Sequence, residues 1–173
     1  MFRFSLSGIS PFWWIYTTLL CGSCAALGVA WVMEFGFDIK PCFLCLWQRV
    51  PYYAAIILLM TYGVLAFFRP RIHAPTFKRW VLAVMALLFT LGALLALYHA
   101  GIEWHFWTQA ETCSEKGPIL DFHRWRQELE HATVAQCDEA AFRFMGLSPA
   151  GWNGLLSIGF AALSSYGAWY KRS

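Results

Sequence analysis

The sequence predicts an all-α membrane protein, a bundle of four transmembrane helices, and three observations lead to it. Of the 173 residues 59% are apolar and only 13% are charged, about half the charged share of a soluble domain. Four long windows hold no Asp, Glu, Lys or Arg. The remaining charges are sorted by sign between the two ends of these windows. This balance excludes a disordered chain, and the net charge of +3 gives no reason to expect nucleic acid as a partner.

Each charge-free window defines one span of a single integral domain, residues 1–173. A helix needs about 20 apolar residues to cross the hydrocarbon, and without strand-like alternation a helix is the backbone form that can do so. The first window is longer than the apolar core of a signal peptide, so we expect it to be retained. Pro149 suits the start of the last helix. We predict spans at about 11–33, 46–68, 80–101 and 150–170, joined by loops at about 34–45, 69–79 and 102–149.

The charges predict the direction of these spans. The side with both termini and the 69–79 loop holds seven Lys and Arg residues and no acid, while all ten acids lie on the other side. Because positive charge marks cytoplasmic loops, we expect cytoplasmic termini and an external 102–149 loop. Within that loop the pattern favours an amphipathic helix near 122–132 and a short helix from Asp138 to Met145, stopped by Gly146.

A C-x-x-C motif, Cys42 to Cys45, opens the second predicted helix. Helix N-termini stabilise a thiolate. Arg49 follows Cys45 by four residues and shares its helix face, so a permanent cation would favour ionised Cys45 further. The alternative is an interfacial arginine beside an inert disulfide.

Four other cysteines have different surroundings. Cys113 and Cys137 lie in the outer loop, where they form either a static staple worth about 3 kcal/mol or a second pair that exchanges with the first. Cys21 and Cys24 lie within the first span, in a run of small residues that favours close helix packing. Structural zinc needs two short-spaced ligand pairs, which the sequence lacks, so we expect no metal site.

Together these features resemble the disulfide bond formation protein B (DsbB) family. The resemblance covers roughly residues 10–170. It rests on four spans with cytoplasmic termini, a cysteine pair in the second outer loop, and Pro41-Cys42-x-Leu44-Cys45-x-x-Gln48-Arg49. The runs Tyr98–Trp104 and Cys137–Ala140 also look like family sequence.

The resemblance implies a quinone-dependent thiol oxidase of the bacterial inner membrane. Cys113 would form a mixed disulfide with a periplasmic thioredoxin-fold oxidase of the DsbA type, and Cys137 would pass reducing equivalents to Cys42. Cys45 would face ubiquinone or menaquinone from the membrane pool, with Arg49 on the ring oxygen. His99 is a second candidate quinone contact, or else an ordinary interfacial histidine. Two other functions stay open: a specialised relative with a dedicated partner, and a non-catalytic scaffold stapled by disulfides.

Overall fold

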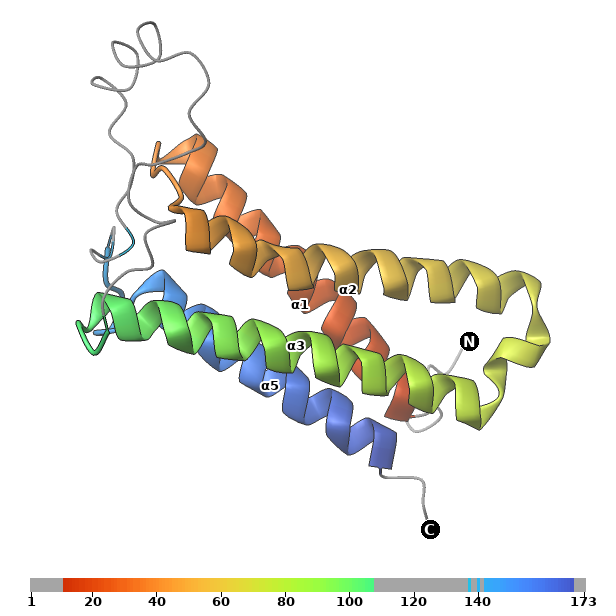
Figure 1. The fold of residues 1–173 in the computed structure, drawn as a ribbon. Helices are drawn as coiled ribbons and strands as arrows, with labels where there is room; N and C mark the ends of the chain where they lie inside the picture. The colour runs from red at the N-terminus through yellow and green to blue at the C-terminus, as the bar shows by residue number, and fades with distance from the viewer. Residues whose placement is uncertain (1–10, 108–136, 138–139, 141, 170–173) are drawn as a thin grey trace, which may run out of the picture.

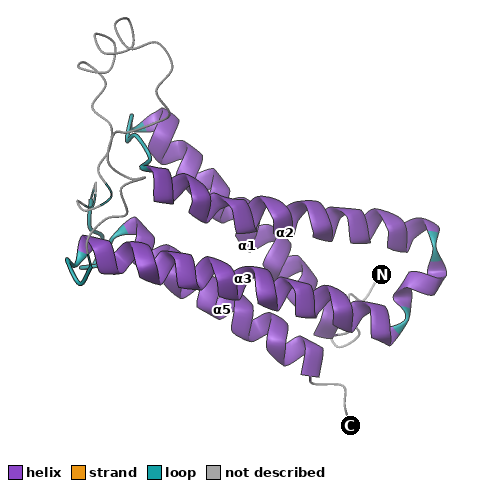
Figure 2. Cartoon of the chain, in the orientation of Figure 1, coloured by secondary structure: helices purple, strands orange, loops and turns teal. Residues whose placement is uncertain are grey.

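The protein is an all-α bundle of four helices in a computed structural model that describes residues 11–107, 137, 140 and 142–169. The helices are α1 (Pro11–Trp31), α2 (Phe43–Phe68), α3 (Pro75–Glu103) and α5 (Pro149–Trp169). They run lengthwise beside one another (Figure 1). The described residues contain no β-strand (Figure 2). The predicted fold class is confirmed.

The helix ends follow local sequence signals. Pro75 and Pro149 are the first residues of α3 and α5, a position where the missing N–H of proline costs nothing. A short 3-10 turn, Pro70–His73, joins α2 to α3. The helix of the first span continues beyond α1 as a π-helical turn, Val32–Gly36, and this extension carries Glu34 to the end of the bundle where α2 begins.

Three helical stretches are long and apolar enough to cross a membrane: Pro11–Gly36, Phe43–Phe68 and Pro75–Glu103. The fourth helix, α5, is as long as α1 but carries more polar residues. Ser157 and Ser164 of α5 are fully buried, and α5 makes its most extensive contacts with α3. These serines therefore point into the bundle, where Ser157 Oγ lies 3.1 Å from the Tyr52 hydroxyl of α2.

The main core fills the middle of the bundle. Leu19, Leu59 and Phe89 are fully buried, and the ring of Phe89 meets that of Phe160 edge-to-face at 5.0 Å, a favoured aromatic geometry. The Tyr16 hydroxyl donates to the Leu59 carbonyl at 2.9 Å. These contacts hold α1, α2, α3 and α5 together. A second, smaller cluster of buried residues lies at the end of the bundle that carries Cys42.

The predicted helix from Asp138 to Met145 is wrong over its described part. Phe144 and Leu147 exchange two backbone hydrogen bonds, at 2.9 and 3.1 Å. Between them, Met145 and Gly146 have φ of 53° and 83°. Two consecutive positive φ values form a tight hairpin turn, which is incompatible with a helix. The predicted helix near 122–132 lies outside the described residues.

The run of small residues around Cys21 and Cys24 allows close helix packing, as predicted, but the two cysteines are not the residues in contact. Both side chains are exposed on the outside of α1. The close approach occurs at Gly22, where an added Cβ would collide with the Phe160 ring, and at Ser23, which is fully buried. Cysteine is larger than glycine or serine, so the two smaller neighbours take the side that faces the bundle.

Candidate active site

The two cysteines of the C-x-x-C motif lie at the first turn of α2, as predicted. Cys42 is the N-cap residue, with φ −73° and ψ 168°, and its sulfur accepts the Cys45 N–H at 3.3 Å. The Cys42 thiol in turn donates to Cys45 Sγ at 2.8 Å. The spacing creates this geometry because an N-cap side chain reaches the N–H three residues on.

The two sulfurs differ in their environment. The hydrogen bond to Cys45, together with burial, raises the pKa of the Cys42 thiol to about 12, and His99 opposes this only in part. Cys42 therefore keeps its proton at neutral pH and donates it toward Cys45. When the pair loses one proton, the negative charge rests on Cys45, because Cys42 keeps its proton and donates it to that sulfur.

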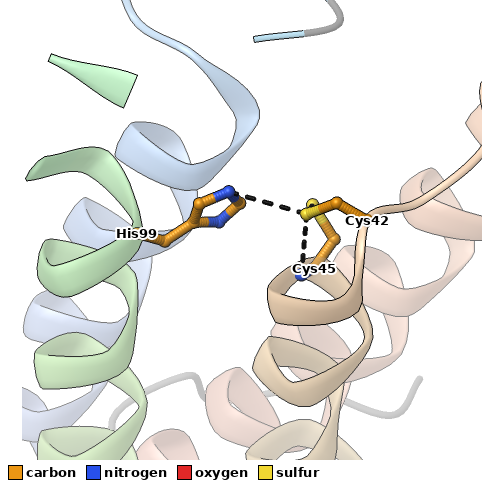
Figure 3. Close-up of side chains that lie close together, drawn as sticks. All are labelled: Cys42, Cys45 and His99. Atoms are coloured by element: carbon orange, nitrogen blue, oxygen red, sulfur yellow. Dashed lines mark hydrogen bonds between the residues drawn. The ribbon is translucent and has the colours of Figure 1, made fainter. Parts of the chain in front are cut away.

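His99 of α3 faces this pair from across the bundle (Figure 3). Its Nε2 lies 3.6 Å from Cys42 Sγ, and the side chain is buried. Glu103, one helical turn further on, places Oε1 3.8 Å from the same nitrogen. Its Oε2 is buried and has no hydrogen-bond partner among the described residues. Sequence reasoning missed Glu103, although its i,i+4 spacing from His99 placed both on one face of α3.

A chain of polar side chains stands behind His99. Gln48 Nε2 lies 2.7 Å from His99 Nδ1. Asn153 of α5 donates to Gln48 Oε1 at 2.6 Å, and the Tyr52 hydroxyl donates to Asn153 Oδ1 at 2.5 Å. Three helices thus contribute to one buried network. Asn153 and Tyr52 were not predicted as site residues, because their meeting depends on how α5 packs against α2.

Arg49 has a different partner from the one expected. Its guanidinium pairs with the Glu34 carboxylate at 2.5 Å, and both side chains are largely shielded from solvent. Glu34 comes from the π-helical turn that extends α1. The two full charges pair directly because a carboxylate offers a stronger, charge-assisted hydrogen bond than a thiol does.

A cavity of about 170 Å³ joins these groups. It is lined by four of the five described site residues predicted from sequence, Cys42, Cys45, Arg49 and His99, and Cys137 is the one that does not line it. Small and apolar side chains of α1, including Ala26 and Ala30, line another part of it. Since a dry cavity of about 150 Å³ holds a benzene ring, the volume and lining fit a single six-membered ring with polar substituents.

The remaining cysteines divide by position. Cys137 is buried in the small cluster that also contains Cys42, and Cys45 packs against this cluster. The chain therefore brings a cysteine from the segment between α3 and α5 to the helix pair, 92 residues from Cys45 in sequence. Cys113 lies outside the described residues.

Metal binding is chemically feasible at the same place. Cys42, Cys45 and His99 offer ligand atoms within 4.8 Å of one another, and thiolate and imidazole are ligands that zinc accepts. The expectation of no metal site stays a prediction.

The fold and the site define a class: a membrane-spanning helical protein with a buried thiol pair at the end of a helix and a ring-sized cavity beside it. Comparison with known sequences identifies the family. Residues 12–167 match the profile of the disulfide bond formation protein DsbB family, so the chain belongs to this family. It is a membrane protein of disulfide bond formation.

Individual relatives agree with this assignment. The chain is 30% identical over 148 residues to disulfide bond formation protein B of Marinobacter nauticus, covering 80% of this chain and 81% of that protein. The protein of the same name in Hahella chejuensis is 26% identical over 165 residues, covering 91% and 93%. That of Haemophilus influenzae is 26% identical over 145 residues, covering 80% and 75%. The comparison with solved structures found no significant match.

Proposed function

We propose that the protein is a protein-thiol:quinone oxidoreductase that reoxidises a periplasmic DsbA-like dithiol oxidase. The observation that carries the proposal is that Cys42 and Cys45 line a ring-sized, largely apolar cavity. A disulfide that only stabilises the fold needs neither such a cavity nor a sulfur arranged to hold negative charge. Membership of the DsbB family supports the same reaction class.

The first stage transfers a disulfide to the partner. A thiolate of the reduced partner attacks Cys113 of a Cys113–Cys137 disulfide, and the partner's second thiol then resolves this mixed disulfide. The partner leaves oxidised, while Cys113 and Cys137 become thiols. Exchange of this kind requires an accessible sulfur and a good leaving thiol.

The second stage returns the loop cysteines to the disulfide state. Cys137 attacks Cys42 of the Cys42–Cys45 disulfide, Cys113 then displaces Cys42, and the helix pair is left as a dithiol. Supporting this order, Cys137 shares a buried cluster with Cys42. Cys42 is also the sulfur that His99 approaches, so an N–H donor stands beside the thiol that leaves.

The cavity residues that would hold a quinone are Arg49, His99 and Cys45. A bound ubiquinone or menaquinone would accept the two electrons and two protons of the Cys42–Cys45 dithiol and return to the membrane pool as quinol. The protein would supply a charged sulfur, N–H donors for the ring oxygens and shielding from water. Arg49 could contribute its remaining N–H donors while Glu34 keeps the guanidinium in place.

We also propose that the protein lies in the bacterial inner membrane with its redox cysteines on the periplasmic side. The support is the charge asymmetry: no acidic residue occurs at the end that holds the 69–79 loop. The periplasm is an oxidising space in which disulfides persist.

The proposal is tested with purified protein, a reduced DsbA-type partner and a soluble ubiquinone analogue. Cys45→Ser should abolish quinone reduction, and Arg49→Met should raise the apparent KM for quinone more than that for the partner. Cys113→Ser should block oxidation of the partner. Quinone reduction at the wild-type rate in Cys45→Ser, or oxidation of the partner by Cys113→Ser, would contradict the assignment.

A dedicated partner in place of a general oxidase is tested separately. In Cys137→Ala, Cys113 is a lone thiol that attacks the disulfide of the oxidised partner, giving a Cys113–partner mixed disulfide and one free partner thiol, and no Cys137 thiol remains to release the reduced partner by forming a Cys113–Cys137 disulfide. Mass spectrometry of the trapped species from intact cells identifies the partner, and capture of a thioredoxin-fold oxidase other than the general one would favour the specialised relative.

A further inference from the structure

The polar chain behind His99 has a single direction. The Tyr52 hydroxyl donates to Asn153 Oδ1, and the Asn153 amide donates to Gln48 Oε1. The Gln48 amide then meets His99 Nδ1. The same direction continues on the other side of the imidazole, where Nε2 faces Cys42 Sγ and the Cys42 thiol donates to Cys45 Sγ. The six residues thus form a series in which each donates to the next, and Cys45 is the final acceptor.

This direction fixes the tautomer of His99. A neutral imidazole has one donor and one acceptor nitrogen. Because the Gln48 amide nitrogen donates to Nδ1, the proton of a neutral His99 must be on Nε2. That N–H lies between Cys42 Sγ at 3.6 Å and Glu103 Oε1 at 3.8 Å, so it points at the sulfur pair and at the neighbouring carboxylate.

The orientation of Gln48 depends in turn on α5. An amide can be flipped end for end with little change of shape, so a partner must decide which end faces His99. Asn153 decides it by donating to Gln48 Oε1, and Tyr52 decides the orientation of Asn153 by donating to its oxygen. A second contact, Tyr52 Oη to Ser157 Oγ at 3.1 Å, holds the tyrosine hydroxyl in place.

We propose that Tyr52 and Asn153 are positioning residues that set the His99 tautomer and thereby hold negative charge on Cys45. The inference rests on the proposed function, in which Cys45 is the sulfur that faces the quinone. Hydrogen bonds in series polarise one another in a low-dielectric interior, so a chain that ends on Cys45 favours charge there. The Arg49 guanidinium contributes less to holding negative charge on Cys45, since its own charge is paired with Glu34.

Two neighbouring tyrosines on α2 provide a matched test. Tyr52→Phe removes the first donor of the chain, whereas Tyr53→Phe removes a hydroxyl whose partner is Trp31 Nε1, outside the chain. The readout is the alkylation rate of Cys45 in the reduced protein at fixed neutral pH, followed by mass spectrometry. We expect Tyr52→Phe to slow alkylation about 2- to 5-fold, the effect of weakening one hydrogen bond, and Tyr53→Phe to leave it unchanged.

Asn153→Asp tests the direction of the chain itself. A carboxylate accepts from Tyr52 and from Gln48 but cannot donate, so Gln48 must turn its oxygen toward His99. The imidazole proton should then move from Nε2 to Nδ1. The measurement is the ¹⁵N NMR spectrum of histidine-labelled protein, with His99 assigned by its loss in His99→Asn.

Three results would overturn the proposal: equal Cys45 alkylation in Tyr52→Phe and Tyr53→Phe, a proton on Nδ1 in the wild type, or an unchanged tautomer in folded Asn153→Asp. A purely structural role would lower the thermal stability of Tyr52→Phe without changing either chemical readout. Neither readout involves quinone. If both shifts occur but quinone is not reduced, the proposed function fails while the positioning role stands.

Discussion

The hydrogen bond between the two helix thiols gives a quantitative prediction for Cys42. Its thiol donates to Cys45 Sγ at 2.8 Å, and this bond is the largest cause that raises the Cys42 pKa from its ordinary value near 9.0 to about 12. At neutral pH the raised pKa lowers the thiolate fraction of Cys42 about a thousandfold. A more basic thiolate is also more nucleophilic, with a Brønsted slope of about 0.5, so the net reactivity of Cys42 falls about 30-fold.

Cys45→Ala removes the acceptor and therefore most of this effect. Burial continues to raise the pKa of Cys42, while His99 continues to lower it. We expect Cys42 to be alkylated about 10- to 30-fold faster in the variant than in the reduced wild type. The rise of its alkylation rate with pH should level off at a lower pH in the variant, because the Cys42 pKa is lower there. In the wild type, Cys42 should stay protonated up to its raised pKa, so its alkylation should still be rising at the alkaline limit of stability.

The assay is iodoacetamide alkylation of fully reduced protein in detergent, with each cysteine quantified by peptide mass spectrometry. Glutathione added to the same sample is the internal standard for reagent and pH. If Cys42 reacts as fast as Cys45 in the wild type, or no faster in Cys45→Ala, then the hydrogen bond does not protect Cys42 and the assignment of charge to Cys45 is incorrect.

Three other changes test the fold and the site. Gly22→Ala places a methyl group against the Phe160 ring and should destabilise the bundle by about 1–3 kcal/mol, whereas Gly28→Ala, which has open space around it, should be neutral or stabilising in thermal unfolding; equal effects would contradict the packing of α1. Glu34→Gln leaves the shielded Arg49 charge without its carboxylate and should cost about 2 kcal/mol of stability, measured against Asp38→Asn, an exposed acid beside it in sequence; equal melting temperatures would show that the ion pair does not contribute. Changing Cys21 and Cys24 together to Ala should leave turnover within about twofold of wild type, because both are exposed on the outside of α1 and surface substitutions have small effects; a large loss of activity would assign them a role that the structure does not suggest.

The sequence was sufficient for the elements whose causes are local. Charge-free windows placed the helices, Pro149 marked the start of α5, and the C-x-x-C spacing placed Cys42 at the N-cap of α2. Each of these depends on residues within a few positions of one another, so composition and spacing contain the information. The direction in which Cys21 and Cys24 point was different, because a run of small residues does not show which of them faces Phe160.

The sequence predicted individual residues of the site but not the contacts between them. Arg49 was expected to act on Cys45 through their shared helix face, but Glu34, 15 residues earlier, competes for its charge. The contacts of His99 join residues about 50 positions apart, and Asn153 meets Gln48 across 105 positions. These meetings depend on helix packing, which no short motif records. Glu103 was predictable in principle from its spacing to His99.

The central claim is tested most directly by a single turnover. Reduced protein in which Cys113 and Cys137 are replaced by Ser, so that only the helix pair can react, is mixed with a ubiquinone analogue in lipid nanodiscs, and quinol and free thiols are counted together. The account predicts one quinol formed per protein with loss of the Cys42 and Cys45 thiols, and no quinol when Cys45 is also changed to Ser. Quinol formation without loss of these two thiols, or none at all from the intact pair, would contradict it.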